Sequence, residues 1–144
     1  MELDELYTEI ITQYSRSDKH RHPPENADVK TRGVNPSCGD DLTLYLNIDD
    51  NVIKNVEMSG EGCAISQASA SIMADLMEGK SVEEAQELIK KFIGMIKKEV
   101  TDEDELEELG DAAAFENISN MPARVKCAVL AWHTLEEALN KKQE

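Results

Sequence analysis

The chain has 144 residues, 40% of them hydrophobic, which is enough to bury the core of one domain over residues 1–144. Thirty acidic against fifteen basic side chains give a formal net charge of −15. This balance argues against nucleic acid and against anionic membranes, since both bind through lysine and arginine. No apolar run reaches the roughly 20 residues of a membrane span, and the acidic N-terminus lacks a signal-peptide pattern. We therefore expect a cytoplasmic protein.

The first half of the chain predicts a helix, a long loop and a β-hairpin. Apolar residues recur at helical spacing over 2–15, whereas residues 16–37 carry charges and prolines and predict a surface loop. Apolar and polar residues alternate over 42–48, which predicts a strand, and 52–59 reads as the returning strand. A short third strand or turn is expected near Cys63.

The second half predicts mainly helices. Residues 64–78 form an alanine- and serine-rich helix, and Ser81 with Glu84 forms a capping box for the next one. The acidic stretch 101–110 fits either a solvated helix or a disordered excursion, and Pro122 suits the first turn of a C-terminal helix. This order predicts an α+β fold in which helices pack on one face of a small three-stranded antiparallel sheet.

The side chains most able to carry chemistry are three dispersed cysteines and one aspartate, namely Cys38, Asp40, Cys63 and Cys127. Gly39 allows a tight turn, so the Cys38 thiol and the Asp40 carboxylate can point at one place. Cys63 lies just before a predicted helix, whose N-terminus favours a thiolate, and Cys127 lies inside the last helix. Three thiolates and one carboxylate make the four ligands that tetrahedral zinc takes.

Less specific interpretations remain open. Cysteine is often buried as a small hydrophobic residue, and no CxxC pair is present, so the spacing alone is a weak metal signal. His20 and His22 are expected to be exposed in the loop, and His133 lies six residues after Cys127, too far round the helix to share its face. A cysteine hydrolase is disfavoured because no histidine is close to a cysteine in sequence. A closed structural zinc domain stays possible.

Three segments resemble the IscU/SufU (NifU-N-like) family of iron–sulfur cluster biogenesis: Asn-Pro-Ser-Cys-Gly-Asp at 35–40, Gly-Glu-Gly-Cys-Ala-Ile-Ser-Gln-Ala-Ser-Ala-Ser at 60–71 and Pro-Ala-Arg-Val-Lys-Cys-Ala at 122–128. The resemblance spans nearly the whole chain and implies a SufE/NifU-like fold. Lys126 stands where the IscU branch has a histidine, and residues 120–126 depart from that branch's Leu-Pro-Pro-Val-Lys chaperone motif. These departures resemble the SufU branch, which binds zinc.

The resemblance implies a zinc-dependent sulfur acceptor, a relay of the sulfurtransferase type rather than a conventional enzyme. It would take persulfide sulfur from a SufS-like cysteine desulfurase and pass it on. Zinc would be held by Cys38, Asp40, Cys63 and Cys127, with Cys38 as the sulfur acceptor. We expect Arg124, which lies near Cys127 in sequence, to support the contact with the partner. The alternative is a U-type scaffold that assembles a transient iron–sulfur cluster and transfers it to downstream assembly proteins.

Overall fold

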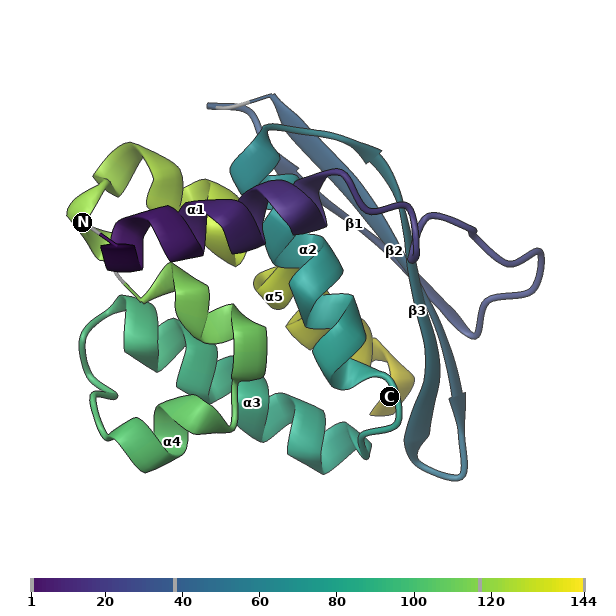
Figure 1. The fold of residues 1–144 in the computed structure, drawn as a ribbon. Helices are drawn as coiled ribbons and strands as arrows, with labels where there is room; N and C mark the ends of the chain where they lie inside the picture. The colour runs from purple at the N-terminus through teal and green to yellow at the C-terminus, as the bar shows by residue number, and fades with distance from the viewer. Residues whose placement is uncertain (1, 38, 117, 144) are drawn as a thin grey trace.

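The structure is a computed structural model that describes residues 2–37, 39–116 and 118–143 (Figure 1). The elements in chain order are α1 (Glu2–Ser15), β1 (Val29–Asn35), β2 (Asp40–Asp49), β3 (Val52–Glu61), α2 (Ala64–Met77), α3 (Val82–Ile96), α4 (Glu103–Glu107), the 3-10 helices η1 (Gly110–Phe115) and η2 (Ile118–Asn120), and α5 (Pro122–Gln143). Among the described helices, none is both long and apolar enough to cross a bilayer.

The sheet has the strand order β1-β2-β3 and is antiparallel throughout, as predicted. The hairpin between β2 and β3 turns at Asp50 and Asn51, whose φ angles of 53° and 64° suit the tight turns that match strand twist. Along β2, fully buried residues alternate with partly exposed ones, so one face of the sheet packs against the helices. Figure 1 shows the helices gathered on that side.

The identity of the third strand corrects the sequence analysis. The strand is β1, which lies inside the stretch predicted to be a loop, whereas no strand forms after Cys63 in the described chain. Strand β1 buries Val29, Thr31 and Asn35 alternately although its sequence is largely polar. Helix α5 packs directly on it, and the side chain of Thr134 leaves no room for a Cβ atom at Gly33. A long-range contact thus decides this strand, which local composition could not reveal.

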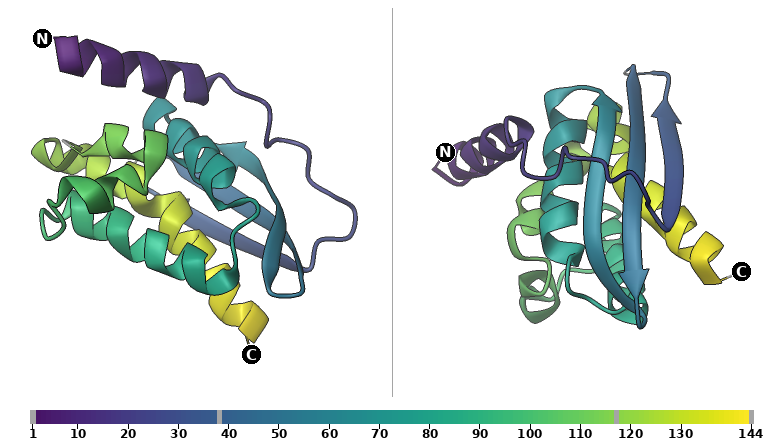
Figure 2. Two further views of the ribbon diagram at one scale, coloured as in Figure 1. Left: turned by 60° about the horizontal axis from the view of Figure 1, so that its bottom comes forward. Right: turned by 90° about the vertical axis from the view of Figure 1, so that its right-hand side faces the viewer.

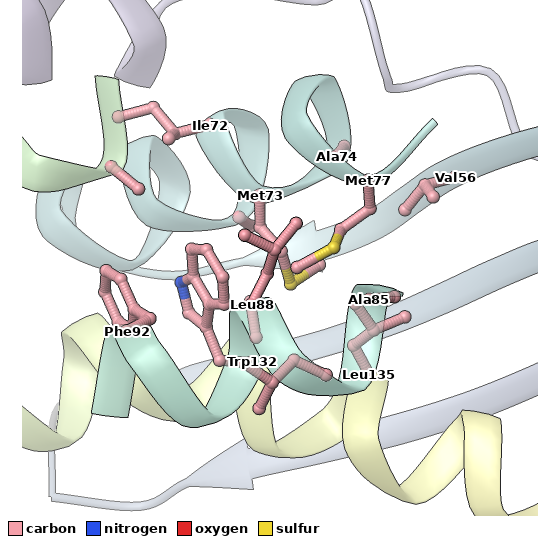
Figure 3. Packing of buried hydrophobic residues seen from close by; sticks show 14 of the residues in the cluster. Val56, Ile72, Met73, Ala74, Met77, Ala85, Leu88, Phe92, Trp132 and Leu135 are labelled. Atoms are coloured by element: carbon pink, nitrogen blue, oxygen red, sulfur yellow. The ribbon is translucent and has the colours of Figure 1, made fainter. Parts of the chain in front are cut away.

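The core lies between α2, α3 and α5 and the face of the sheet that they cover (Figures 2 and 3). The rings of Phe92 and Trp132 stack with centroids 3.9 Å apart, and both side chains are fully buried. The Trp132 indole donates a hydrogen bond of 2.9 Å to Ser69 on α2. This packing fixes α5 relative to α2, and both of these helices carry a cysteine of interest at or beside one end.

The acidic stretch 101–110 is folded. Asp102 caps α4 by accepting a hydrogen bond from the Asp104 amide, while Leu106 and Leu109 are buried. The acidic side chains of α4 remain exposed, so the apolar residues turn inward and the charges outward. Of the two predicted alternatives, the structure shows the solvated helix.

Candidate metal centre

Three of the four predicted ligands meet at one end of the sheet. Asp40 begins β2, Cys63 occupies the N-cap position of α2, and Cys127 lies in the second turn of α5. One ligand atom from each of the three lies within 4.8 Å of the other two. Asp40 and Cys127 are buried, at 1% and 0% exposure, while Cys63 is partly exposed. Cys38, the fourth predicted ligand, lies outside the described residues.

The turn between β1 and β2 brings the first motif to the centre. Asn35 and Asp40 face each other as the last pair of the β1–β2 ladder, so residues 36–39 form the connection. Gly39 has a φ of 71°, a conformation that glycine adopts without strain, and Ser37 in the same connection is exposed. Cys38 falls by sequence in this connection, two residues before the buried Asp40.

Two glycines allow the end of β3 and the start of α2 to lie close to β2. Gly60 has a φ of 115° and lies so close to the Asp41 carbonyl that a Cβ atom has no space. At Gly62, a Cβ atom would lie 2.6 Å from the Asp40 carboxylate. The Gly-Glu-Gly sequence before Cys63 is therefore what allows this close approach.

Asp40 accepts hydrogen bonds from three residues, one in β1 and two at the N-terminal end of α2. Its Oδ1 atom accepts hydrogen bonds from the Cys63 amide at 2.9 Å and the Ser66 hydroxyl at 3.1 Å. Its Oδ2 atom accepts from the Asn35 side chain at 3.4 Å, and the same amide group lies 3.8 Å from the Cys127 sulfur. Asp40 thus satisfies the N-terminus of α2 as well as facing the two thiols, so it is more than a turn residue. Asn35 and Ser66 lie in the segments that carry the family resemblance, but the sequence did not predict that they contact Asp40.

The donor set fits a tetrahedral metal ion. Two thiols and a carboxylate are ligands that zinc accepts, and bonds of about 2.0–2.3 Å place neighbouring ligand atoms roughly 3.3–3.8 Å apart. A buried carboxylate needs a positive partner, yet no lysine or arginine of the described chain pairs with Asp40. Arg32 donates instead to the exposed Asp41, and this hydrogen bond lowers the pKa of Asp41. A bound cation would supply the missing charge.

Exposed basic and apolar residues lie close in sequence to Asn35 and Cys127. Arg124 is exposed on the first turn of α5, one turn before Cys127, and Lys126 is exposed as well. Val34 and Met121 are large apolar residues that are about half exposed, at 47% and 51%.

The histidine predictions are confirmed in part. His22 is exposed, and the His133 side chain is 54% exposed, facing Glu136 rather than the cysteines. The prediction that His20 is exposed is wrong, because this residue is only 3% exposed. Its ring is buried between β3 and the end of α2, where Val56 and Asp75 provide hydrogen-bond partners that the local sequence does not reveal.

Gly62→Ala is expected to weaken zinc binding about tenfold, as disturbing the partners of a metal ligand commonly does. The added methyl group would displace the Asp40 carboxylate and the Ser66 hydroxyl. Competition with a chromophoric chelator measures the affinity. Gly79→Ala is the control, because Gly79 has a φ of 89° with open space around it, so its replacement strains the backbone without touching the site. Equal affinities in the two variants would contradict the prediction.

Comparison with known proteins finds relatives that match nearly the whole chain. The model of the family described as NifU-like N terminal domain matches residues 6–144. The chain is 45% identical to the iron–sulfur cluster assembly scaffold protein IscU of Thermotoga maritima, over 94% of each chain. It is 34% identical to the zinc-dependent sulfurtransferase SufU of Bacillus subtilis, over 98% of this chain and 94% of the relative.

Solved structures show the same fold. The crystal structure of an iron–sulfur cluster assembly scaffold protein for the SUF system from Fervidobacterium islandicum matches with a TM-score of 0.87 and 41% identity, covering 94% of this chain and 97% of the other. The N-terminal domain of a NifU-like protein from Brucella abortus, at 20% identity and a TM-score of 0.85, covers 99% and 98% and supports the fold alone. The chain therefore belongs to the NifU-like N terminal domain family, the IscU/SufU scaffold family of iron–sulfur cluster assembly.

Proposed function

We propose that this chain is a zinc-dependent sulfur acceptor, which takes persulfide sulfur from a SufS-type cysteine desulfurase and passes it on. The observation that carries the proposal is the meeting of Asp40, Cys63 and Cys127 beside the turn that contains Cys38. The zinc-dependent sulfurtransferase among the relatives supports the same activity. Lys126 supports it further, because an ammonium group next to Cys127 offers no metal ligand.

Cys38, Asp40, Cys63 and Cys127 would hold the metal. Bound there, zinc would keep the coordinated thiols deprotonated and would tie β2, α2 and α5 together. Asp40 is oriented for this role by the Cys63 amide and the Ser66 hydroxyl. Asp40 and Cys127 are both buried, so these two ligands also close this end of the core.

Cys38 is the proposed nucleophile. Its thiolate attacks the terminal sulfur of the persulfide on the desulfurase, a new sulfur–sulfur bond forms on Cys38, and the desulfurase cysteine leaves as a thiolate. The step is redox-neutral and needs no further reactant. Position favours Cys38, because residues 36–39 connect two strands, whereas Cys63 lies at the N-cap position of α2 and Cys127 is fully buried in α5. Loops commonly present reactive groups on a rigid scaffold.

Desulfurase turnover tests the proposal. Adding the zinc-loaded chain to a SufS-type desulfurase with cysteine is expected to raise the rate of alanine formation, because an acceptor regenerates the enzyme's free cysteine. The metal-free chain, prepared with a chelator, should stimulate weakly. Equal stimulation by both forms would contradict a zinc-dependent acceptor.

Stimulation is also expected to fall as the salt concentration rises. The net charge of −15 would steer the chain toward a positive patch on the desulfurase, and salt screens such attraction over about 10 Å at 0.1 M. Arg124 would lie at this interface, together with the exposed apolar residues Val34 and Met121. The half-maximal concentration for stimulation, measured across a sodium chloride series, checks the prediction. A half-maximal concentration that does not change with salt would contradict electrostatic steering.

The second candidate is a scaffold for cluster assembly. The relative from Thermotoga maritima and the structure from Fervidobacterium islandicum both carry that description. Thiolates at the same positions also suit ligation of an iron–sulfur cluster, which would then be the cargo. The two candidates differ in what the chain receives first, sulfur alone or iron with sulfide.

A further inference from the structure

A second group of possible metal ligands lies at the opposite end of α2 from the cysteines. His20, Glu57 and Glu78 each offer one ligand atom within 4.8 Å of the others. Helix α2 has 14 residues, which at 1.5 Å per residue separates the two groups by about 20 Å. The segment between α1 and β1 passes beside the edge strand β3 (Figure 2). There the His20 carbonyl accepts a hydrogen bond from the Met58 amide.

The buried ring of His20 faces oxygen acceptors on both sides. Its Nε2 atom lies 2.8 Å from the Asp75 carboxylate, so an Nε2–H group donates there. Its Nδ1 atom lies 3.1 Å from the Val56 carbonyl, 3.6 Å from Glu78 and 3.9 Å from Glu57. A neutral imidazole has one N–H group, so its second nitrogen would meet these oxygens lone pair to lone pair. A positive charge must therefore lie between them, either a second ring proton or a metal cation.

The local charge favours a divalent cation. Lys19 pairs with Asp75 at 2.7 Å, whereas no lysine or arginine in the described part of the chain forms an ion pair with Glu57 or Glu78. With a neutral His20, these two glutamates leave two negative charges, which a divalent ion would balance. Their side chains are largely sheltered, at 15% and 30% exposure, so solvent neutralises them only in part.

Backbone and side-chain partners already orient each of these ligands. The Val56 amide donates to Glu78 at 3.0 Å, the His22 amide donates to Glu57 at 2.9 Å, and Asp75 fixes the ring of His20. A carboxylate on the second nitrogen is the usual arrangement of a metal-binding histidine. The distances from Nδ1 to the three oxygens bracket the roughly 3.3 Å between ligands of a tetrahedral ion with bonds of about 2.0 Å.

We propose that the His20 imidazole, the carboxylates of Glu57 and Glu78 and the Val56 carbonyl form a second metal site, for a divalent first-row transition ion. One nitrogen and three oxygens make this site harder than the cysteine centre, so it accepts manganese or ferrous ions as well as zinc. The bound ion ties the segment between α1 and β1 to the edge strand β3 and to the end of α2. The site is independent of sulfur transfer, so the proposed function can fail without affecting it.

Manganese(II) is the selective probe, because thiolate sites favour softer ions. Titration of the full chain, followed by electron paramagnetic resonance, is expected to show one bound manganese ion per chain. His20→Gln and Glu57→Gln should each weaken binding at least tenfold, and Asp75→Asn about tenfold. His133→Gln and Glu136→Gln are matched controls, since this exposed pair on α5 also lies 3.9 Å apart. Cys63→Ser should retain the manganese ion.

Two results would overturn the proposed second metal site. The proposal is wrong if the wild-type chain binds neither manganese nor a second zinc ion. Nitrogen NMR would then be expected to find both ring nitrogens of His20 protonated. It is also wrong if His20→Gln and His133→Gln bind manganese equally. Circular dichroism checks that each variant is folded, and Glu57→Gln provides an independent reading if His20→Gln does not fold.

Discussion

Cys127→Ser is expected to abolish tight zinc binding and to remove the stability that zinc confers. Cys127 is fully buried in α5, and its thiol meets Asp40 from β2 and Cys63 before α2. The loss should reach about 4 kcal/mol in the free energy of unfolding where free zinc is about a thousand times the Kd of the wild-type chain. Elemental analysis gives the zinc content, and urea unfolding at fixed free zinc gives the stability.

The control is the same comparison after chelation, where the wild-type chain should lose most of its advantage over Cys127→Ser. Asp40 offers a further test, because Asp40→Asn keeps an oxygen acceptor for the Cys63 amide and the Ser66 hydroxyl but loses the anionic ligand. Asp40→Asn should weaken zinc binding with little loss of metal-free stability, whereas Asp40→Ala should lower both. A wild-type chain without zinc, whose stability is unchanged by chelation, contradicts the account.

Cys38→Ser is expected to reduce sulfur acceptance on the order of 100-fold or more, because a serine hydroxyl cannot replace a thiolate nucleophile. The fold should persist, since the change replaces a single sulfur atom with oxygen in the connection between β1 and β2. The measurement is transfer of labelled sulfur from cysteine through a desulfurase, with circular dichroism as the check on folding. Ser37→Ala, which changes the neighbouring exposed residue, is the matched control and should transfer normally. Equal transfer by Cys38→Ser would assign the acceptor role to another group.

Sequence patterns predicted the elements that short-range interactions determine. The β2–β3 hairpin follows from alternation around the turn at Asp50 and Asn51, and the capping box of Ser81 and Glu84 forms as expected. Strand β1 was missed, because its polar residues become buried only when α5 packs against Gly33.

The candidate site could likewise be predicted only in part from the sequence. The cysteines and Asp40 could be chosen from residue type and from the family resemblance, but their convergence depends on the packing of α2 and α5 on the sheet. Asn35 and Ser66 complete the contacts of Asp40 from positions that no spacing rule relates to it. The burial of His20 was missed for the same reason, since its partners Val56 and Asp75 lie more than 30 residues away along the chain.

The central claim is that the chain receives sulfur on Cys38 while its metal stays in place. The direct measurement is mass spectrometry with peptide mapping after the zinc-loaded chain has been incubated with a cysteine desulfurase and cysteine, together with the zinc content of the same sample. The account predicts one added sulfur atom on the peptide that contains Cys38, with zinc retained. Uptake of iron and sulfide into a transferable cluster, with zinc displaced and no persulfide on Cys38, would contradict it and favour the scaffold.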